Sequence, residues 1–221
     1  MLLEAKQRTK LDNSDDSLFY SIPRFVTHVD EGFIDQLTNL YRDRLKPNTR
    51  IFDMMGSWVS HLPEKVEFAH VEGHGMNEEE LAKNRQLNHY FVHNFNQDLK
   101  IPLPDKDFDA VLNCASIQYL QYPDAIFYEI HRILKPGGIA IISFSNRMFY
   151  DKAIAAWRDN SEEGRVELVK SYFESVKNAN GLPGFSQVEV ISQKSNVPSF
   201  LQALGLGGGD PFYAVIAYRQ F

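Results

Sequence analysis

The sequence predicts a doubly wound α/β domain built on a mainly parallel sheet. Segments typical of buried strands alternate along the chain with segments whose apolar residues recur at helical spacing. Such alternation is the pattern of a parallel sheet with helices on both faces. The run IAIISFS at 139–145 is almost wholly apolar, as expected for a strand that is covered on both sides. With 221 residues, the chain is long enough for one sizeable core.

The first half of the chain begins with a polar and then mixed stretch, residues 1–28, which we expect to form an N-terminal arm or lid. Residues 29–221 are then a single domain. Its first helix is predicted at 30–45, where Phe33, Leu37 and Leu40 share one face. The strands predicted in this half are 50–55, 66–75, 89–95 and 108–116.

A second helix is predicted to follow Asn77. Asn77 is a good helix-capping residue, and Glu80 stands three positions later, which is the spacing of a reciprocal capping box. The three glutamates at 78–80 also suit the positive end of the helix dipole.

The second half holds the clearest helix, 123–138, which opens on Pro123 and is expected to stop at the Pro-Gly-Gly of 136–138. A further helical face runs through 165–178. Strands are predicted at 139–145, 187–192 and 211–220, with a short helix near 198–204 and a glycine-rich turn at 205–210 before the last strand.

Composition narrows the classes of function. The formal net charge of -6 argues against a broad nucleic-acid-binding surface. No apolar run approaches the roughly 20 residues of a membrane-spanning helix. The single cysteine, Cys114, excludes an internal disulfide and fits a reducing compartment. We therefore expect a cytoplasmic protein that binds neither nucleic acid nor membrane; the oligomeric state is left open.

Two motifs at matched spacing indicate a family. The stretch LPDKDFDAV precedes the strand at 108–116, and ILKPGG ends the helix that follows it. Together they resemble the class I S-adenosylmethionine-dependent methyltransferases of type 11, over about residues 45–145. The resemblance implies a Rossmann-like sheet of seven strands with the last strand antiparallel. It also implies S-adenosylmethionine as cofactor, lying across the ends of the first four strands.

The first motif of that family is altered here. The family pattern D-x-G-x-G-x-G, read from Asp53, places Met55, Ser57 and Val59 at the glycine positions. The acid that binds the ribose in the family becomes Gly75. A divergent subset of methyltransferase-like proteins carries D-x-x-x-S-W-x-S-H at this place, and residues 53–61 resemble that subset. The sequence SFSNR at 143–147 resembles it as well.

The resemblance implies candidate residues at the strand ends. The predicted cofactor-binding residues are Asp53, Met54, Gly56, Ser57, Gly75, Asn94, Phe95, Asn96 and Asn113. Phe95 is expected to offer its backbone N–H to the adenine. The predicted acceptor-binding residues are Ser116, Gln118, Asn146 and Arg147, and the candidate catalytic residues are His61, as a general base, and Tyr119. Each of these also has an ordinary structural interpretation. Trp58 is expected to fill the space that the missing glycines leave.

The histidines spaced four apart, His70 with His74 and His89 with His93, fall on predicted strands without a carboxylate or thiol cluster, so no metal site is predicted. Two functions stay open. The first is methyl transfer from S-adenosylmethionine to a small molecule, by in-line displacement, and the sequence leans towards it. The second is a non-catalytic binding or regulatory protein of the same fold, which the altered glycine and ribose positions favour.

Overall fold

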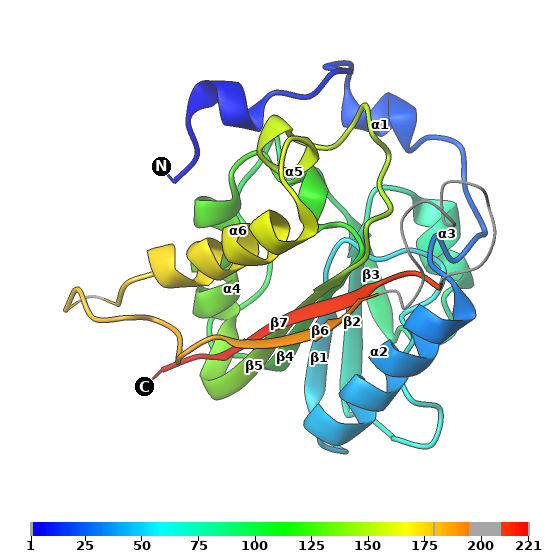
Figure 1. Cartoon of the computed structure of the whole chain (residues 1–221). Helices are drawn as coiled ribbons and strands as arrows, with labels where there is room; N and C mark the ends of the chain where they lie inside the picture. The colour runs from blue at the N-terminus through cyan, green and yellow to red at the C-terminus, as the bar shows by residue number, and fades with distance from the viewer. Residues whose placement is uncertain (1, 179, 195–208, 221) are drawn as a thin grey trace.

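The computed structural model describes residues 2–178, 180–194 and 209–220. Within these residues seven strands form one sheet in the order β3-β2-β1-β4-β5-β7-β6 (Figure 1). The strands are β1 Arg50–Asp53, β2 His70–Gly75, β3 His89–Val92, β4 Phe108–Cys114, β5 Leu134–Phe144, β6 Glu189–Gln193 and β7 Phe212–Tyr218. The α-helices are α1 Asp16–Phe19, α2 Glu31–Arg44, α3 Glu78–Lys83, α4 Pro123–Ile133, α5 Ala155–Arg158 and α6 Glu162–Ser175, and two 3₁₀ helices are η1 Ala5–Arg8 and η2 Ile117–Tyr119.

The strand directions confirm the predicted fold class. Strands β1 to β5 pair in parallel with their neighbours, whereas β7 is antiparallel to both β5 and β6. Six strands therefore run one way and the last strand runs the other way, as the resemblance implies. The chain turns from β1 towards β2 and β3 on one side, and β4 lies on the other side, so the strand order reverses between β1 and β4. In open α/β sheets this is the place where ligands bind.

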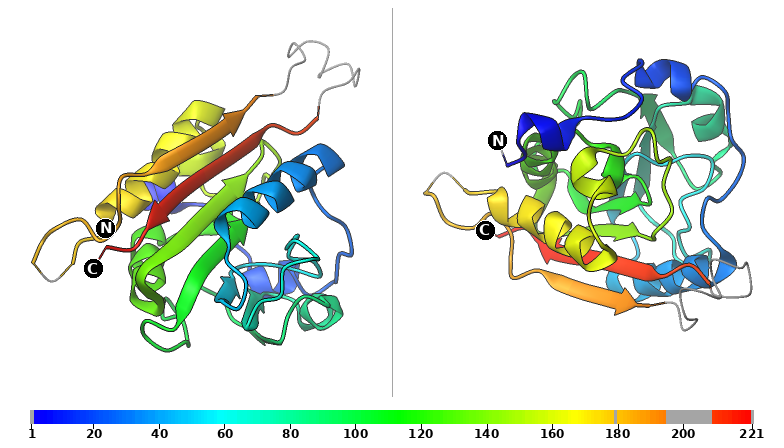
Figure 2. Two further views of the ribbon diagram at one scale, coloured as in Figure 1. Left: turned by 90° about the horizontal axis from the view of Figure 1, so that it is seen from below. Right: turned by 45° about the horizontal axis from the view of Figure 1, so that its top comes forward.

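Helices cover both faces of the sheet (Figure 2). On one face α2 buries Phe33 and Leu37 against Ile51 and other strand residues. On the opposite face α4 and α6 pack against Phe52 and its neighbours. Consecutive residues of β1 thus serve opposite cores, because side chains alternate between the two faces of a strand.

The connection between β1 and β2 contains no helix. Residues 54–69 form an irregular loop that begins with the turn after Asp53. Met55 and His61 have φ angles of 57° and 55°, in the left-handed region that an α-helix cannot contain. A loop, not a helix, therefore follows the carboxyl end of β1 at this edge of the sheet.

Helix α4 ends five residues before the predicted end of 138. The backbone is already extended at Leu134, because the carbonyls of Arg132 and Ile133 accept hydrogen bonds from the N–H groups of Lys106 and Asp107, at 2.9 and 2.8 Å. These carbonyls need no further helical turn, so β5 begins at once. The predicted helix near 198–204 and most of the glycine-rich turn lie outside the described residues.

Helix α3 is capped by Asn77, whose side chain accepts from the Glu80 N–H at 3.0 Å. The other half of the predicted capping box, a hydrogen bond from the Asn77 N–H to the Glu80 side chain, is wrong. The Glu80 carboxylate accepts from Arg24 N–H and Ser57 Oγ instead. Among the described helices, none has the length and apolar character to cross a lipid bilayer.

Candidate active site

A cavity of ≈ 800 Å³ lies beyond the carboxyl ends of β1, β2 and β4. Its floor includes Asp53 from β1, Gly75 from β2 and Cys114 from β4. Its roof comes from the N-terminal segment, with Asp16, Tyr20 and residues 24 and 26–29. Figure 1 shows this segment crossing above the strand ends. Most of the polar residues that the sequence predicts at separate strand ends thereby line one cavity.

The turn after β1 follows a glycine-like path without the glycines of the family. Met55 takes the left-handed conformation, φ 57°, at the first of the altered glycine positions. A Cβ atom on Gly56 would lie 2.8 Å from Asp53 Oδ2, so Gly56 allows the carboxylate to fold under the turn. The backbone of the turn thus keeps an unusual shape although most of its residues carry side chains.

His74 on β2 holds this turn in place. Met55 N–H donates to His74 Nδ1 at 3.0 Å, and Gly56 N–H donates to the His74 carbonyl at 2.7 Å. Since Nδ1 accepts, Nε2 carries the proton and donates to the His93 carbonyl at 2.9 Å. Burial lowers the pKa of His74 to about 3, so the ring is a neutral bridge between β1, β2 and the end of β3.

Gly75 has no room for the acid that the family places there. A Cβ atom on Gly75 would lie 2.6 Å from the Gly56 carbonyl oxygen. The turn after β1 therefore occupies the position of an acidic side chain at the end of β2, and the loss of that acid and the altered turn have one cause.

Asp53 is a buried carboxyl group at the cavity floor. Burial raises the pKa of Asp53 to about 7, although Ser60 Oγ donates to its Oδ2 at 2.6 Å. Asn84 Nδ2 in turn donates to Ser60 Oγ at 2.9 Å and to the Ser57 carbonyl at 3.0 Å. This chain of hydrogen bonds fixes residues 57–60 around the carboxyl group.

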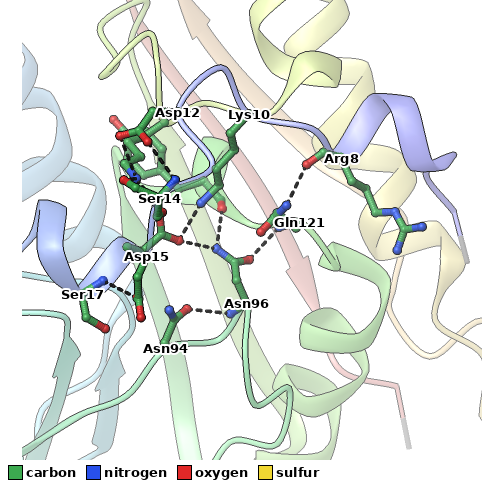
Figure 3. Close-up of polar contacts among 12 residues, drawn as sticks. Arg8, Lys10, Asp12, Ser14, Asp15, Ser17, Asn94, Asn96 and Gln121 are labelled. Atoms are coloured by element: carbon green, nitrogen blue, oxygen red, sulfur yellow. Dashed lines mark hydrogen bonds and ion pairs between the residues drawn. The ribbon is translucent and has the colours of Figure 1, made fainter.

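At the end of β3, three predicted residues have different environments. Asn94 Oδ1 accepts from the Asn96 N–H and closes its own loop. Asn96 donates to Asp16 Oδ2 at 3.1 Å and to the Tyr119 carbonyl at 3.0 Å, so it joins the roof to the β4 side of the cavity (Figure 3). The Phe95 N–H makes no hydrogen bond among the described residues, while its ring lies 4.0 Å from the His74 ring.

At the end of β4, Asn113 is fully buried and does not line the cavity. Its Nδ2 donates to the Met54 carbonyl at 3.0 Å and to Ser116 Oγ at 2.9 Å, so Asn113 positions its neighbours. Met54 is also fully buried. Gln118 lines the cavity at 1% exposure, and its Oε1 has no hydrogen-bond partner among the described residues.

The two candidate catalytic residues line the cavity. Burial lowers the pKa of His61, so the imidazole is neutral near pH 7. Burial also raises the pKa of Tyr119, whose hydroxyl accepts from the Phe149 N–H at 2.9 Å. The phenol therefore keeps its proton and is a hydrogen-bond donor rather than a base.

On the β5 side, Asn146 and Arg147 line the cavity but are exposed and paired. Arg147 Nε lies 2.6 Å from Asp210 Oδ1 at the start of β7. Asn146 Nδ2 makes a long hydrogen bond of 3.4 Å to Glu162. Their binding of an acceptor stays a prediction.

The roof is fastened by a buried lysine. Lys152 is 0% exposed, and its Nζ donates to the Ser14 carbonyl at 3.0 Å and lies 3.0 Å from Asp12 Oδ2 and 3.4 Å from Asp16 Oδ1. Hydrogen bonds from Ser14, with help from Lys152, lower the pKa of Asp12 to about 2. Lys10 pairs with the other oxygen of Asp16 at 2.6 Å. Figure 3 shows Lys10, Asp12 and Ser14 of this segment together with Asn96.

Trp58 does not fill the space of the missing glycines. Its indole N–H donates to the Val26 carbonyl at 3.0 Å, and its ring makes an edge contact with Phe25. Trp58 thus joins the first turn to the roof and leaves the cavity open.

His70, His89 and Cys114 have structural roles. Glu72 bridges His70 and His89, at 2.8 and 2.5 Å, across β2 and β3. Within the ranges that the structure describes, no group of three or more His, Cys, Asp or Glu residues is arranged to hold a metal ion. Burial raises the pKa of Cys114 to about 12, so its thiol is not an activated nucleophile.

Sequence reasoning missed Glu80, Lys152 and the bridging role of His74. The spacing of Glu80 from Asn77 predicts a helix-capping residue rather than a cavity residue, and a lone lysine such as Lys152 is expected at the surface. Lys152 stands next to Asp151, directly before the apolar run AIAAW at 153–157, and nothing in that local pattern singles it out.

Comparisons with known proteins agree with this geometry. Residues 56–142 match the family model described as a methyltransferase domain. Over 133 residues the chain is 28% identical to sterol 24-C-methyltransferase of Gibberella zeae, which covers 56% of this chain and 33% of that protein. The matched regions span a third or less of the curated relatives.

Solved methyltransferase structures share the fold. A putative methyltransferase in complex with the Haloferax volcanii Trm112 methyltransferase activator has a TM-score of 0.60 at 14% identity, covering 86% of this chain and 91% of that one. A Haemonchus contortus phosphoethanolamine N-methyltransferase with bound S-adenosylhomocysteine has a TM-score of 0.56 at 16% identity, covering 85% and 52%.

Residues 56–142 therefore match a methyltransferase domain, and the described sheet has the fold of solved methyltransferases, as the sequence motifs predict. The family match also supports the predicted cofactor, S-adenosylmethionine.

Replacing Gly75 by alanine is expected to lower the free energy of unfolding by about 1–3 kcal/mol, the usual cost of overpacking. The added methyl group meets the backbone carbonyl of Gly56, which His74 holds in place. Chemical denaturation measures the loss. The matched control is Gly32→Ala in α2, where the nearest atom lies at 3.5 Å, and this change leaves stability unchanged or raises it. Equal effects of the two substitutions contradict the packing of the turn over β2.

Proposed function

We propose that this chain transfers a methyl group from S-adenosylmethionine to a small molecule held in the cavity. The observation that carries the proposal is the ≈ 800 Å³ space at the reversal of strand order, with the Asp53 carboxyl group in its floor and a fastened roof. A volume of this size falls in the range of small-molecule sites, which is roughly 300–1,000 Å³. It accommodates a nucleoside-containing donor together with a small acceptor.

The residues at the β1 and β3 ends fit the donor. The Phe95 N–H is free to donate to an adenine ring nitrogen, as the family resemblance implies. Asp53, Gly56, Ser57, Gly75 and Asn94 line the same space. Asn96 also lines the cavity, but its side-chain Nδ2 already donates hydrogen bonds to Asp16 in the roof and to the Tyr119 carbonyl. Met54 and Asn113 act by positioning, because neither lines the cavity.

S-adenosylmethionine supplies an already activated methyl group, so the chain needs little acid–base machinery. Its own residues must align the acceptor with the donor and exclude water. Such positioning accounts for roughly 7–11 kcal/mol of a barrier. The roof of residues 16–29 and the tightly bonded turn at 53–60 are suited to both tasks.

The acceptor belongs on the β4 side. The unpaired Oε1 of Gln118 is a hydrogen-bond acceptor for a hydroxyl or amine group of the substrate. The neutral imidazole of His61 is able to accept the proton that the nucleophile releases. Tyr119, which keeps its proton, orients the acceptor by donating a hydrogen bond.

The alternative is a protein of the same fold that has lost its donor. The altered glycine positions motivated it, but Met55 keeps the left-handed path and Trp58 leaves the cavity open. These two observations support the enzyme.

Calorimetric titration with S-adenosylhomocysteine tests the proposal. We expect saturable 1:1 binding, because the demethylated donor makes the same nucleoside contacts, and we expect labelled S-adenosylmethionine to yield a methylated small molecule from a substrate panel. ATP, which shares the adenosine group but carries a triphosphate, is the control and binds more weakly. No heat and no thermal shift at millimolar S-adenosylhomocysteine overturns the proposal.

The stability of Asp53→Asn relative to the wild type is expected to rise with pH. The folded-state pKa of Asp53 is raised to about 7, above its ordinary value of 3.8, so burial opposes the ionised form. The loss of wild-type stability that comes from ionising buried Asp53 is absent below pH 4, grows between pH 4 and 7 and is complete above pH 7. Asparagine does not titrate, so the difference in melting temperature between variant and wild type grows over that interval and then levels off.

The same carboxyl group gives a test of donor binding. If the ammonium group of the donor interacts with ionised Asp53, the affinity of the wild type for S-adenosylhomocysteine rises about tenfold from pH 6 to pH 8. Asp53→Asn has a flat profile. A wild-type profile that is equally flat assigns Asp53 to the turn alone.

We also propose that residues 1–28 act as a lid whose closed position depends on Lys152. Lys152→Met removes the bonds to Ser14, Asp12 and Asp16. The free energy of opening the segment is then expected to fall by about 2 kcal/mol, which raises the population of the open state roughly thirtyfold. Hydrogen exchange of residues 9–20 measures the opening. Lys170→Met, which removes an exposed pair with Glu167, is the control. Unchanged exchange in Lys152→Met contradicts the role of the lysine.

A further inference from the structure

We infer that Glu80 of α3 binds the ribose hydroxyls of the donor, in place of the acid that the family carries at the end of the second strand. The inference rests on the proposed function, because it assigns a contact within the same site. It concerns a residue that the family motif does not point to.

The end of β2 offers no acid to the cavity. At Gly75 a side chain is blocked by the Gly56 carbonyl, 2.6 Å from the position of a Cβ atom. Glu72, the nearest acid on the strand, does not line the cavity, and its two oxygens are held by His70 and His89. A nucleoside in this cavity therefore needs another carboxylate for its two hydroxyl groups.

Three acidic residues line the cavity within the described chain, and two of them are engaged elsewhere. Asp16 is bonded to Lys10, Asn96 and Lys152 in the roof. Asp53 lies beneath Gly56, and its pKa of about 7 leaves it partly protonated near neutral pH. Glu80 differs from Asp16 and Glu72 because, within the described residues, its carboxylate accepts two hydrogen bonds but forms no ion pair with a Lys, Arg or His side chain.

Glu80 is placed for this role by the first turn of α3. Asn77 caps the helix, so the Glu80 side chain is free to leave the helix end and enter the cavity wall, where the residue is 9% exposed. One oxygen accepts from the Arg24 N–H at 2.6 Å, and the other accepts from Ser57 Oγ. A carboxylate has about four acceptor positions, so two remain for a pair of hydroxyl groups.

The position of Glu80 also connects the donor to the roof. Arg24 belongs to the roof and Ser57 to the turn after β1, and both bind the same carboxylate. A ribose bound to Glu80 therefore contacts the group on which the closed roof depends. We expect the nucleoside to reinforce the position of the N-terminal segment.

The test compares adenosine with 2′,3′-dideoxyadenosine, which lacks both hydroxyl groups, on the full chain and on Glu80→Gln. The wild type is expected to bind adenosine at least tenfold more tightly than the dideoxy compound. Glu80→Gln loses most of this preference by binding adenosine more weakly, while its affinity for the dideoxy compound is unchanged. Glu79→Gln, an exposed neighbour on the same helix, keeps the wild-type preference.

The outcomes separate a ribose contact from a structural role. If Glu80 only braces the roof, Glu80→Gln weakens both nucleosides by the same factor, and the inference is overturned. The wild-type comparison needs no variant, so a Glu80→Gln chain that does not fold leaves a second measurement: equal wild-type affinities for the two nucleosides also overturn it. If the wild type binds S-adenosylhomocysteine without a ribose preference, the proposed function survives alone. If the wild type binds neither nucleoside nor S-adenosylhomocysteine, both the proposed function and the role of Glu80 are overturned.

Discussion

The site depends on the contact between the turn after β1 and His74 of β2. Two backbone N–H groups of the turn, from Met55 and Gly56, bind the ring and the carbonyl of this one residue. The contact draws the turn over β2, and this position excludes a side chain at Gly75. It also keeps the imidazole neutral and in one tautomer, because both ring nitrogens have partners and burial disfavours the charged form. The position of the turn and the missing acid at Gly75 are thus parts of one packing arrangement.

The roof is the second condition for a working cavity, and both apolar and charged contacts hold it. Leu18 and Ile22 in the N-terminal segment are 70% and 71% exposed, whereas Leu3 is buried and Phe19 makes an edge contact with Phe149. The segment is also held by Lys152, which is fully buried among oxygen atoms of residues 12–16. A buried lysine without partners is costly, so the side chain favours the closed position of the segment. A hydrophobic patch would hold a lid with less dependence on geometry.

The sequence predicted the sheet and its helices well because these rest on periodic patterns. Alternating apolar runs placed all seven strands, and the helical face through Phe33 and Leu37 placed α2. The predicted end of α4 was wrong for a physical reason. It depends on tertiary hydrogen bonds from Lys106 and Asp107 that no local pattern encodes.

The site was predictable as a place and less so as a set of contacts. Strand ends can be read from the sequence, and most of the residues predicted there line one cavity. What each side chain binds depends on neighbours far away in the chain. Asn96 is hydrogen-bonded to Asp16, and Glu80 is hydrogen-bonded to the N–H of Arg24, 56 residues away. The missing acid at Gly75 looked like a loss, since the sequence does not show that the turn occupies that position.

The distribution of strained backbone bears on whether the cavity is used. Six described non-glycine residues have positive φ angles, and four of them line the cavity: His28, Met55, His61 and Ala115. A left-handed residue with a side chain costs roughly 1–2 kcal/mol, and such residues gather where function requires a special shape. An inert descendant of an enzyme has no reason to keep these costs around one cavity, since glycine or a relaxed loop would remove them. The strain therefore supports a cavity that still binds a ligand, and His61 and Ala115 place part of it on the side where the acceptor is proposed to lie.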